Sequence, residues 1–431
     1  MGHINHVKNE YKELQKRLDR NPVGAPESEH LYEIFRLLYT DKEARVASRM
    51  PMTPSTAGRI AKRTGMGVAE LERLLDGMAD KGLVMDFEHR KLGKKFYMLA
   101  PPVVGFFEFS MMRERSDIPQ KELAEAMYRY MYTTGDFARE VFGAGTTQLG
   151  RAVAHETALS EADLSEVLDW EKATGIVEGA RKHSVALCYC RHKARHLGES
   201  CGKPEEICLS FDDGADWLTG RNLAKEISKG RALELLEQAK EEGLVHIADN
   251  VKMSPTFICN CCGCCCGMLG AINKHGLTDA VHASGFLAAV NLEECRGCGK
   301  CARRCPINAI AIHESTGEDG KKKKWAVVDE SICLGCGVCE RGCKFDSLYM
   351  KKRRGRKIIT PETTLERILT MAIERGRLQH FLFDGMPEGP TAEFLKNLSG
   401  AVLNMPAAKS VLLNREVKSR FLEFITKKAG M

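Results

Sequence analysis

The chain has 431 residues and carries 64 lysines and arginines against 58 aspartates and glutamates, a formal net charge of +6. This length is enough for two to four domains with their own cores, and so small a surplus does not by itself indicate a nucleic-acid partner. No apolar run approaches the ~18 residues of a membrane span, and the N-terminus lacks the apolar stretch of a secretory signal. We therefore expect a soluble, cytoplasmic protein.

The N-terminal segment, residues 1–27, predicts one helix that is stopped by Asn21-Pro22. In residues 28–117, apolar residues at helical spacing predict two amphipathic helices with a short helix between them. Two strands follow, one on each side of Gly93. Helix, short helix, helix and hairpin form an order that resembles the winged-helix domains of bacterial repressors.

The winged-helix resemblance implies DNA binding, but the charge of the second long helix argues against it. A helix that enters the major groove normally carries basic or amide side chains. Here Glu70, Glu72, Asp76 and Asp80 oppose Arg73 alone. The hairpin that follows is basic, with Arg90, Lys91, Lys94 and Lys95. A DNA-binding domain therefore stays open as an alternative to a protein-docking module.

Residues 118–182 predict a helical segment throughout, with apolar and aromatic residues on one stripe. Gly143-Ala144-Gly145 interrupts it. This GxG lacks the third glycine and the preceding strand of a dinucleotide-binding loop, so it is weak evidence for a nucleotide.

Cysteine is the compositional outlier, with 18 residues in the chain. Ten of them fall in residues 183–287, which we interpret as a cysteine-rich iron–sulfur module. One group consists of Cys188, Cys190, Cys201 and Cys208, and the other of Cys259, Cys261, Cys262, Cys264, Cys265 and Cys266. Free thiols packed so closely would oxidise or bind stray metal, so the pattern predicts one or two further clusters.

Two ways of dividing these ten cysteines between clusters stay open. Each group can supply a cluster of its own, or one cysteine of the first group can complete a cluster in the second. The tripeptide Cys261-Cys262-Gly263 resembles the cysteine-rich motif of heterodisulfide reductases, which implies a noncubane cluster. Four nearby histidines are expected to be solvated or structural rather than ligands: His183, His192, His196 and His275.

Residues 288–357 contain one cysteine motif twice. The first copy is Cys295-x2-Cys298-x2-Cys301-x3-Cys305-Pro306, and the second is Cys333-x2-Cys336-x2-Cys339-x3-Cys343. In such a motif three thiolates wrap one cubane cluster and the fourth binds the other cluster. This assigns Cys295, Cys298, Cys301 and Cys343 to one [4Fe-4S] cluster, and Cys333, Cys336, Cys339 and Cys305 to a second.

The doubled motif resembles bacterial dicluster ferredoxins, and Pro306-Ile307-Asn308-Ala309-Ile310 continues the family pattern. The second copy departs from it at Lys344, where proline is usual. The resemblance implies transfer of single electrons at low potential. Zinc can also bind paired CxxC motifs, but two full copies favour iron–sulfur clusters. Disulfides are disfavoured because a cysteine-rich cytosolic chain points to metal.

The surplus of positive charge is concentrated around the doubled motif. Residues 293–357 hold 16 lysines and arginines against 9 acidic residues. Many of the basic residues lie in Lys321–Lys324 and Lys351–Lys357. Free-standing ferredoxins of the resembled family are mostly acidic, so a basic domain predicts docking to a redox protein that carries flavin or another metal centre. The expected docking residues are Lys321, Lys322, Lys323 and Lys324. A solvated charged loop is the alternative.

Residues 358–431 predict a helical C-terminal region that begins at Thr360-Pro361-Glu362. The expected fold class is α+β, with several domains in series. We interpret the chain as an electron-transfer subunit of an anaerobic oxidoreductase complex, and no catalytic residue is assigned. Two alternatives stay open: a reductase whose catalytic site lies in the cysteine-rich module, and a redox-sensing, DNA-binding regulator.

Overall fold

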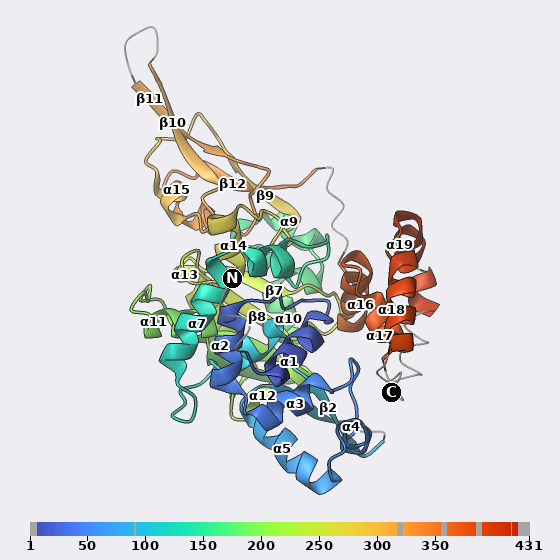
Figure 1. The fold of residues 1–431 in the computed structure, drawn as a ribbon. Coiled ribbons are helices and arrows are strands. Elements are labelled where there is room, and N and C mark those ends of the chain that lie inside the picture. The colour runs from blue at the N-terminus through green and yellow to red at the C-terminus, as the bar shows by residue number, and fades with distance from the viewer. Residues whose placement is uncertain are drawn as a thin grey trace. The chain divides into compact units, whose positions relative to one another are not determined.

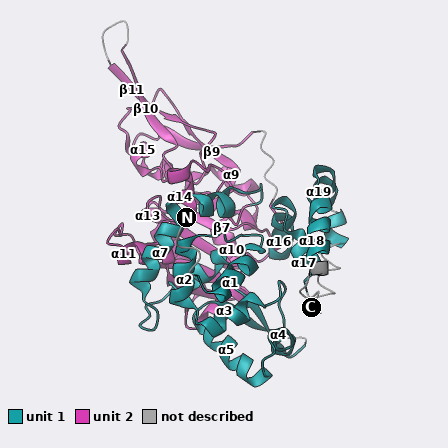
Figure 2. Cartoon of the chain, in the orientation of Figure 1, with its two compact units in different colours: residues 1–147, 364–431 teal, residues 148–363 magenta. Residues whose placement is uncertain are grey.

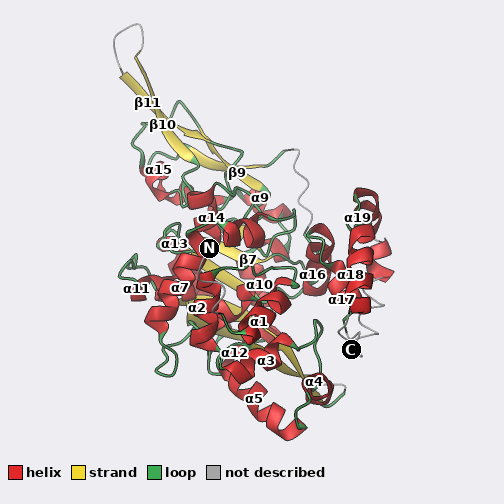
Figure 3. Ribbon diagram, in the orientation of Figure 1, coloured by secondary structure: helices red, strands yellow, loops and turns green. Residues whose placement is uncertain are grey.

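The computed structural model describes residues 7–89, 92–316, 322–354, 360–384, 390–414 and 416–420. Arg90, Lys91, Lys321, Arg356 and Lys357 therefore lie outside the described residues. The chain forms two compact units (Figure 2), one made of residues 1–147 and 364–431 and the other of residues 148–363. Helices and strands both contribute (Figure 3), as the α+β expectation requires.

The first unit opens with five helices and a hairpin. They are α1 (Asn9–Asp19), α2 (Glu29–Leu38), α3 (Asp41–Ser48), α4 (Ala57–Thr64), α5 (Val68–Asp80), β1 (Val84–His89) and β2 (Lys94–Leu99). The elements expected in this region are present, with α3 as an additional helix. Helix α4 ends at Gly65, whose left-handed φ of 73° favours glycine. The two strands pair antiparallel, with Phe87 opposite Phe96.

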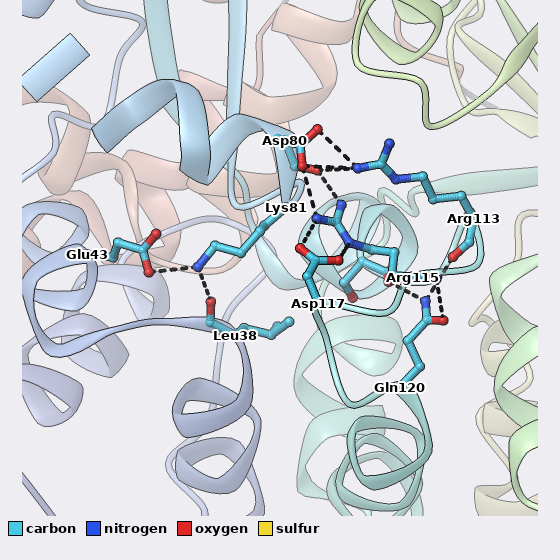
Figure 4. A network of polar contacts seen from close by, with 9 residues as sticks. Leu38, Glu43, Asp80, Lys81, Arg113, Arg115, Asp117 and Gln120 are labelled. Atoms are coloured by element: carbon cyan, nitrogen blue, oxygen red, sulfur yellow. Dashed lines mark hydrogen bonds and ion pairs between the residues drawn. The ribbon is translucent and has the colours of Figure 1, made fainter. Parts of the chain in front are cut away.

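Charged contacts fix the C-terminal end of α5 within the first unit (Figure 4). Asp80 accepts from the guanidinium groups of Arg113 and Arg115, each at 3.0 Å. The Arg115 side chain is 2% exposed and also pairs with Asp117 at 2.5 Å. The next residue, Lys81, pairs with Glu43 at 2.7 Å. The acidic end of α5 is therefore bound to its own unit.

The rest of the first unit is helical. Its helices are α6 (Phe107–Phe109), α7 (Gln120–Tyr132), α8 (Asp136–Ala138), α16 (Thr364–Glu374), α17 (Leu378–Leu382), α18 (Pro390–Leu403) and α19 (Pro406–Leu412). The prediction of a helix start at Thr360-Pro361-Glu362 is wrong. The carbonyls of Pro361 and Glu362 accept from the backbone N–H groups of Lys252 and Met253, so this stretch is engaged with a distant loop and α16 begins at Thr364.

The second unit is built on a six-stranded antiparallel sheet in the order β3-β7-β8-β5-β4-β6. The strands are β3 (Gly150–Val153), β4 (His183–Leu187), β5 (Glu206–Phe211), β6 (Lys225–Ile227), β7 (Val245–Asp249) and β8 (Phe257–Cys261). Its helices are α9 (Glu161–Glu166), α10 (Ala173–Gly179), α11 (Tyr189–His196), α12 (Asp212–Gly220), α13 (Lys229–Glu241) and α14 (Gly267–His275). Buried Phe211, Leu235 and Ile258 belong to the core that these elements share.

The prediction that residues 118–182 are helical throughout is wrong. Gly150–Val153 forms the edge strand β3, with Ala152 opposite Ile247 of β7. All four residues of β3 are buried, and so short a run carries no periodicity that separates strand from helix. The second unit begins at Gln148, close to the predicted interruption at Gly143–Gly145.

The same unit ends in two small antiparallel sheets around the doubled cysteine motif. Strand β9 (Phe286–Val290) pairs with β12 (Leu348–Lys352), and β10 (Ile310–Thr316) pairs with β11 (Lys322–Val328) as the long hairpin seen in Figure 1. Helix α15 (Lys300–Arg304) lies between β9 and β10 in the sequence. Short helical turns elsewhere in the chain are Arg139–Gly143, Glu156–Ala158, Asp169–Glu171 and Glu340–Gly342. Pro102–Phe106 is a bend whose backbone is not helical at Val103, Val104 and Gly105. Within the described residues, every helix is too short or too polar to cross a bilayer.

Candidate metal centres

The first pocket of the doubled motif is lined by Cys295, Cys298, Cys301 and Cys343. The loop before α15 supplies the first cysteines, and Gly297 and Gly299 in it have φ values of 60° and 73°. A side chain at Gly297 would meet Lys324 of β11, so the loop packs directly on the hairpin. The backbone N–H of Ala326 donates to Cys295 Sγ at 3.4 Å.

The second pocket is lined by Cys305, Cys333, Cys336 and Cys339. The backbone N–H of Ala309 donates to Cys305 Sγ at 3.2 Å. Burial raises the pKa of the Cys336 thiol to about 12, and burial also raises the pKa of Cys339 well above its usual value. Such thiols hold their protons until a metal displaces them.

Each pocket thus gathers three cysteines of one copy and the last cysteine of the other. These are the same two sets of four that the spacing assigns to the two clusters.

A third set of sulfurs lies in the cysteine-rich module. The thiols of Cys201, Cys262, Cys264 and Cys265 all lie within 4.8 Å of one another. Cys201 follows α11, and the other three occupy the turn between β8 and α14. A hydrogen bond from the Cys265 thiol, together with the Arg191 guanidinium, lowers the pKa of Cys262 to about 5 despite its burial. A cysteine of the first group therefore joins three of the second, which is one of the two divisions left open by the sequence.

The other six cysteines of the module lie on neighbouring elements of the sheet. Cys208 is on β5, and Cys259 and Cys261 are on β8. Cys188 and Cys190 are at the start of α11, and Cys266 immediately precedes α14. All are free thiols.

Three of the four histidines near these cysteines have polar contacts in the structure. His183 shares a hydrogen bond with the carbonyl of Val177 at 2.7 Å, and the Nε2 atoms of His192 and His196 lie 3.1 Å apart. The sequence did not point to Arg191, which is fully buried. Its place directly after Cys188-x-Cys190 was the available signal.

The turn that carries the third set touches the dicluster domain. A side chain at Gly263 would clash with the carbonyl of Pro306. The Asn273 amide donates to the carbonyl oxygens of both residues, at 3.0 Å and 2.9 Å. Gly263 stands between Cys262 and Cys264, and Pro306 directly follows Cys305. Ligand-bearing segments of two sites are therefore in contact.

Residues 294–347 match the family model described as a 4Fe-4S dicluster domain. No curated protein and no solved structure matches the chain. The matched stretch contains all eight cysteines of the two pockets. The chain therefore carries an iron–sulfur dicluster domain, and the prediction of [4Fe-4S] cofactors is confirmed. Such a domain serves electron transfer.

Proposed function

We propose that this chain is an electron-transfer subunit of an oxidoreductase complex, in which the dicluster domain and the cysteine-rich module form one continuous relay. The observation that carries the proposal is the contact between Gly263 and Pro306. Cys262 and Cys264 flank the first residue and Cys305 precedes the second. Clusters held by these cysteines would be near neighbours, and electron transfer is fast between near neighbours.

Two further contacts support an order for the relay. The backbone N–H of His155, which follows β3, donates to the carbonyl of Cys336 at 2.9 Å. The second pocket therefore faces the six-stranded sheet. The first pocket packs on the β10–β11 hairpin through Gly297 and Lys324, so electrons entering at the hairpin would pass through the second pocket to the cysteine-rich module.

The hairpin also supplies the proposed docking surface for a redox partner. Lys322 and Lys324 lie near the Glu314 carboxylate at 3.7 Å and 3.1 Å, and both are more than half exposed. One acid therefore faces two lysines, and Lys323 between them is exposed as well. The surplus suits an acidic partner, such as a flavoprotein, that approaches by long-range attraction.

Chemically, a bound cluster supplies one-electron oxidation and reduction. The protein supplies thiolates, which lower the potential, and N–H donors to sulfur, which raise it. Ala309 and Ala326 are such donors, one in each pocket.

The test uses the anaerobically purified full chain, partly reduced and then mixed with an oxidant, with freeze-quench paramagnetic resonance as the readout. In Cys336→Ser, which removes a ligand of the second pocket, we expect electron exchange between the first pocket and the cysteine-rich module to slow at least tenfold. Asn273→Ala should slow it less, and Met253→Ala, an exposed site, serves as the control. If the rate of this electron exchange is unchanged in Cys336→Ser, the proposed relay is wrong.

Two other functions give different results in the same preparation. A reductase with its site in the cysteine-rich module is suggested by the exposed thiol of Cys264. It would reduce a disulfide substrate without a partner protein. A DNA-binding regulator would shift genomic fragments in a gel. The acidic residues of α5 argue against DNA binding. Two of them also engage basic side chains that could otherwise contact phosphates, because Asp76 pairs with Lys95 and Glu70 with Lys42.

A further inference from the structure

Three strands bring four of the six remaining cysteines of the module together. Strands β5 and β8 pair antiparallel with Leu209 opposite Ile258, and Cys208 and Cys259 are the residues directly beyond that pair. Cys261 lies two residues further along β8, on the same face. On the other side of β5, Ala186 of β4 lies opposite Cys208, and a bulge follows it. Two residues later the chain reaches Cys188.

Two helix starts supply the other two, Cys190 and Cys266, and the first of these starts also carries Cys188. Cys188 and Cys190 open α11 directly after β4. Cys266 is the last residue before α14. Cys188, Cys190, Cys261 and Cys266 are all buried, with at most 7% of the residue exposed.

The six thiols form a closed ring, in which each lies next to two others whose contacts shift its pKa. Around the ring the order is Cys188, Cys190, Cys266, Cys261, Cys259, Cys208 and back to Cys188. None of these six belongs to the set of Cys201, Cys262, Cys264 and Cys265. The ten cysteines of the module therefore divide into one group of four and one group of six.

A buried positive charge lies against the ring. Arg191 is 0% exposed, and its guanidinium donates to the carbonyls of Pro204 at 2.8 Å and Asn260 at 2.7 Å. Its Nε has no hydrogen-bond partner, and Arg191 makes no ion pair with a carboxylate in the described part of the chain. Burying a guanidinium without a counter-ion is strongly unfavourable.

The groups that favour the charged form of Arg191 and raise its pKa are cysteine sulfurs. Its electrostatic neighbours include Cys188, Cys208 and Cys261 of the ring. A second buried cation, Lys193, is 2% exposed and has Cys190 and Cys266 among its electrostatic neighbours. Two buried cations beside six thiols fit a site whose sulfurs are held as thiolates by a metal centre.

The number of sulfurs limits what the centre can be. A four-iron cubane takes one thiolate per iron and is complete with four cysteines. The ring has six, each next to two others. We propose that Cys188, Cys190, Cys208, Cys259, Cys261 and Cys266 together hold one iron–sulfur cluster through more than four thiolates, with additional irons or bridging thiolates, separate from the four-cysteine site beside it.

The site goes beyond the proposed relay, because it stands on its own sulfurs and cations whether or not electrons reach it. Loading it replaces the thiol protons by iron, so protons are released as the cluster binds. Cys261-Cys262 and Cys265-Cys266 are adjacent pairs with one member in each group, so the two centres share a border.

The test is a scan of six single variants, each of the ring cysteines changed to Ser in the full chain and purified without oxygen. Iron, zinc and acid-labile sulfide are measured per chain, and Mössbauer spectra separate the centres. We expect all six variants to lose or alter the same spectral component. Cys264→Ser, the matched control in the four-cysteine group, should change a different component and leave that one intact.

Two outcomes would overturn the proposal. If two of the six variants keep the full iron content and spectrum, the ring is a cubane site with two bystander thiols. If the ring variants instead lose zinc, the six thiolates hold zinc ions, as six cysteines can do for two of them.

The readout stays informative when a variant is poorly folded. The resonance signals of the dicluster domain report whether the unit has kept its structure, and Cys208 and Cys259, which are only partly buried, are the mildest positions to change. If a ring variant loses its spectral component but keeps the electron-exchange rate of the relay, this proposal stands apart from the proposed function. If the rate falls while the component is kept, the relay is affected and the ring is not.

Discussion

Cys343 shares a pocket with Cys295, although Cys343 closes the second copy of the motif and Cys295 opens the first. Cys305 makes the reciprocal crossing into the pocket of Cys333. The pairing of β9 with β12 supports this arrangement, because it holds the two ends of the domain side by side, with Val290 opposite Leu348. Each copy therefore depends on the other for a complete set of sulfurs.

Changing Cys305 to Ala should damage the cluster of Cys333, Cys336 and Cys339 and spare the other, because the fourth ligand crosses over. Cys343→Ala should have the opposite effect. Paramagnetic resonance of each reduced variant separates the two signals, and Cys264→Ala outside the domain is the control. Loss of the cluster of Cys295 in Cys305→Ala would show that Cys305 binds the cluster of its own copy of the motif.

Replacing Lys321, Lys322, Lys323 and Lys324 by Ser should slow electron transfer to an acidic redox partner at low salt. Attraction between exposed charges fades as the Debye length falls from ~10 Å at 0.1 M salt to ~3 Å at 1 M. The wild-type rate should therefore fall with salt toward that of the variant. Lys225→Ser, at an exposed lysine of β6, controls for the loss of a surface charge outside the hairpin. If the wild type and the four-lysine variant transfer electrons at equal rates at low salt, with unchanged reduction potentials, Lys321–Lys324 form a solvated loop.

Changing Gly335 to Ala should disrupt the second pocket. Its φ is +66°, and a Cβ would clash with the carbonyl of Phe286. The backbone conformation alone costs about 1–2 kcal/mol for a non-glycine residue, and the clash adds to it. We expect loss of the cluster or a lower melting temperature. Gly58→Ala is the matched control, because a Cβ at Gly58 would have nothing within 4 Å and Ala favours the helix. Equal effects of the two changes would contradict the packing.

Acidification should destabilise the second unit through His246. Burial lowers its pKa to about 4, whereas the pKa of an unfolded histidine is about 6.5. The unfolded chain therefore takes up the proton first, so the free energy of unfolding falls below pH ~6.5 and stops falling near pH ~4. Between pH ~6.5 and ~5 the loss is roughly 2 kcal/mol.

Thermal unfolding followed between about pH 7 and pH 5 measures this loss. His246 Nδ1 donates to Asn260 Oδ1 at 2.7 Å, and His246→Gln keeps an amide donor there without a titrating group. We expect a flatter pH dependence in this variant and the wild-type slope in His313→Gln, on the hairpin strand β10. The same slope in both variants would assign the effect to other groups.

The sequence located the dicluster domain because its ligand spacing is local. Each cluster loop is a short motif, so its spacing identifies the ligands without any distant contact. The prediction of a helix start at Thr360 is wrong because it depends on distant contacts. Pro361 and Glu362 are held by Lys252 and Met253, which are distant in the sequence, and a favourable helix start lost to those hydrogen bonds.

The division of the ten upstream cysteines also depended on distant contacts. Cys201 joins Cys262 across the module, with 3.9 Å between the sulfurs, and Cys208 meets Cys259 only because β5 pairs with β8. Spacing along the chain carries no information on strand order. The role of Arg191 could not be predicted for a related reason, because the sequence does not show that a single arginine beside cysteines is buried.

The six-cysteine ring also sets an order of events during biogenesis. As the chain leaves the ribosome, Cys188 and Cys190 emerge first and Cys266 last. The set of six sulfurs is complete only when β8 has taken its place between β5 and β7. If the ring holds the proposed cluster, the assembly machinery must therefore deliver iron and sulfide to a sheet that has already formed. A cell short of iron would accumulate a folded chain with six facing thiols, in which oxygen would close disulfides where the metal belongs.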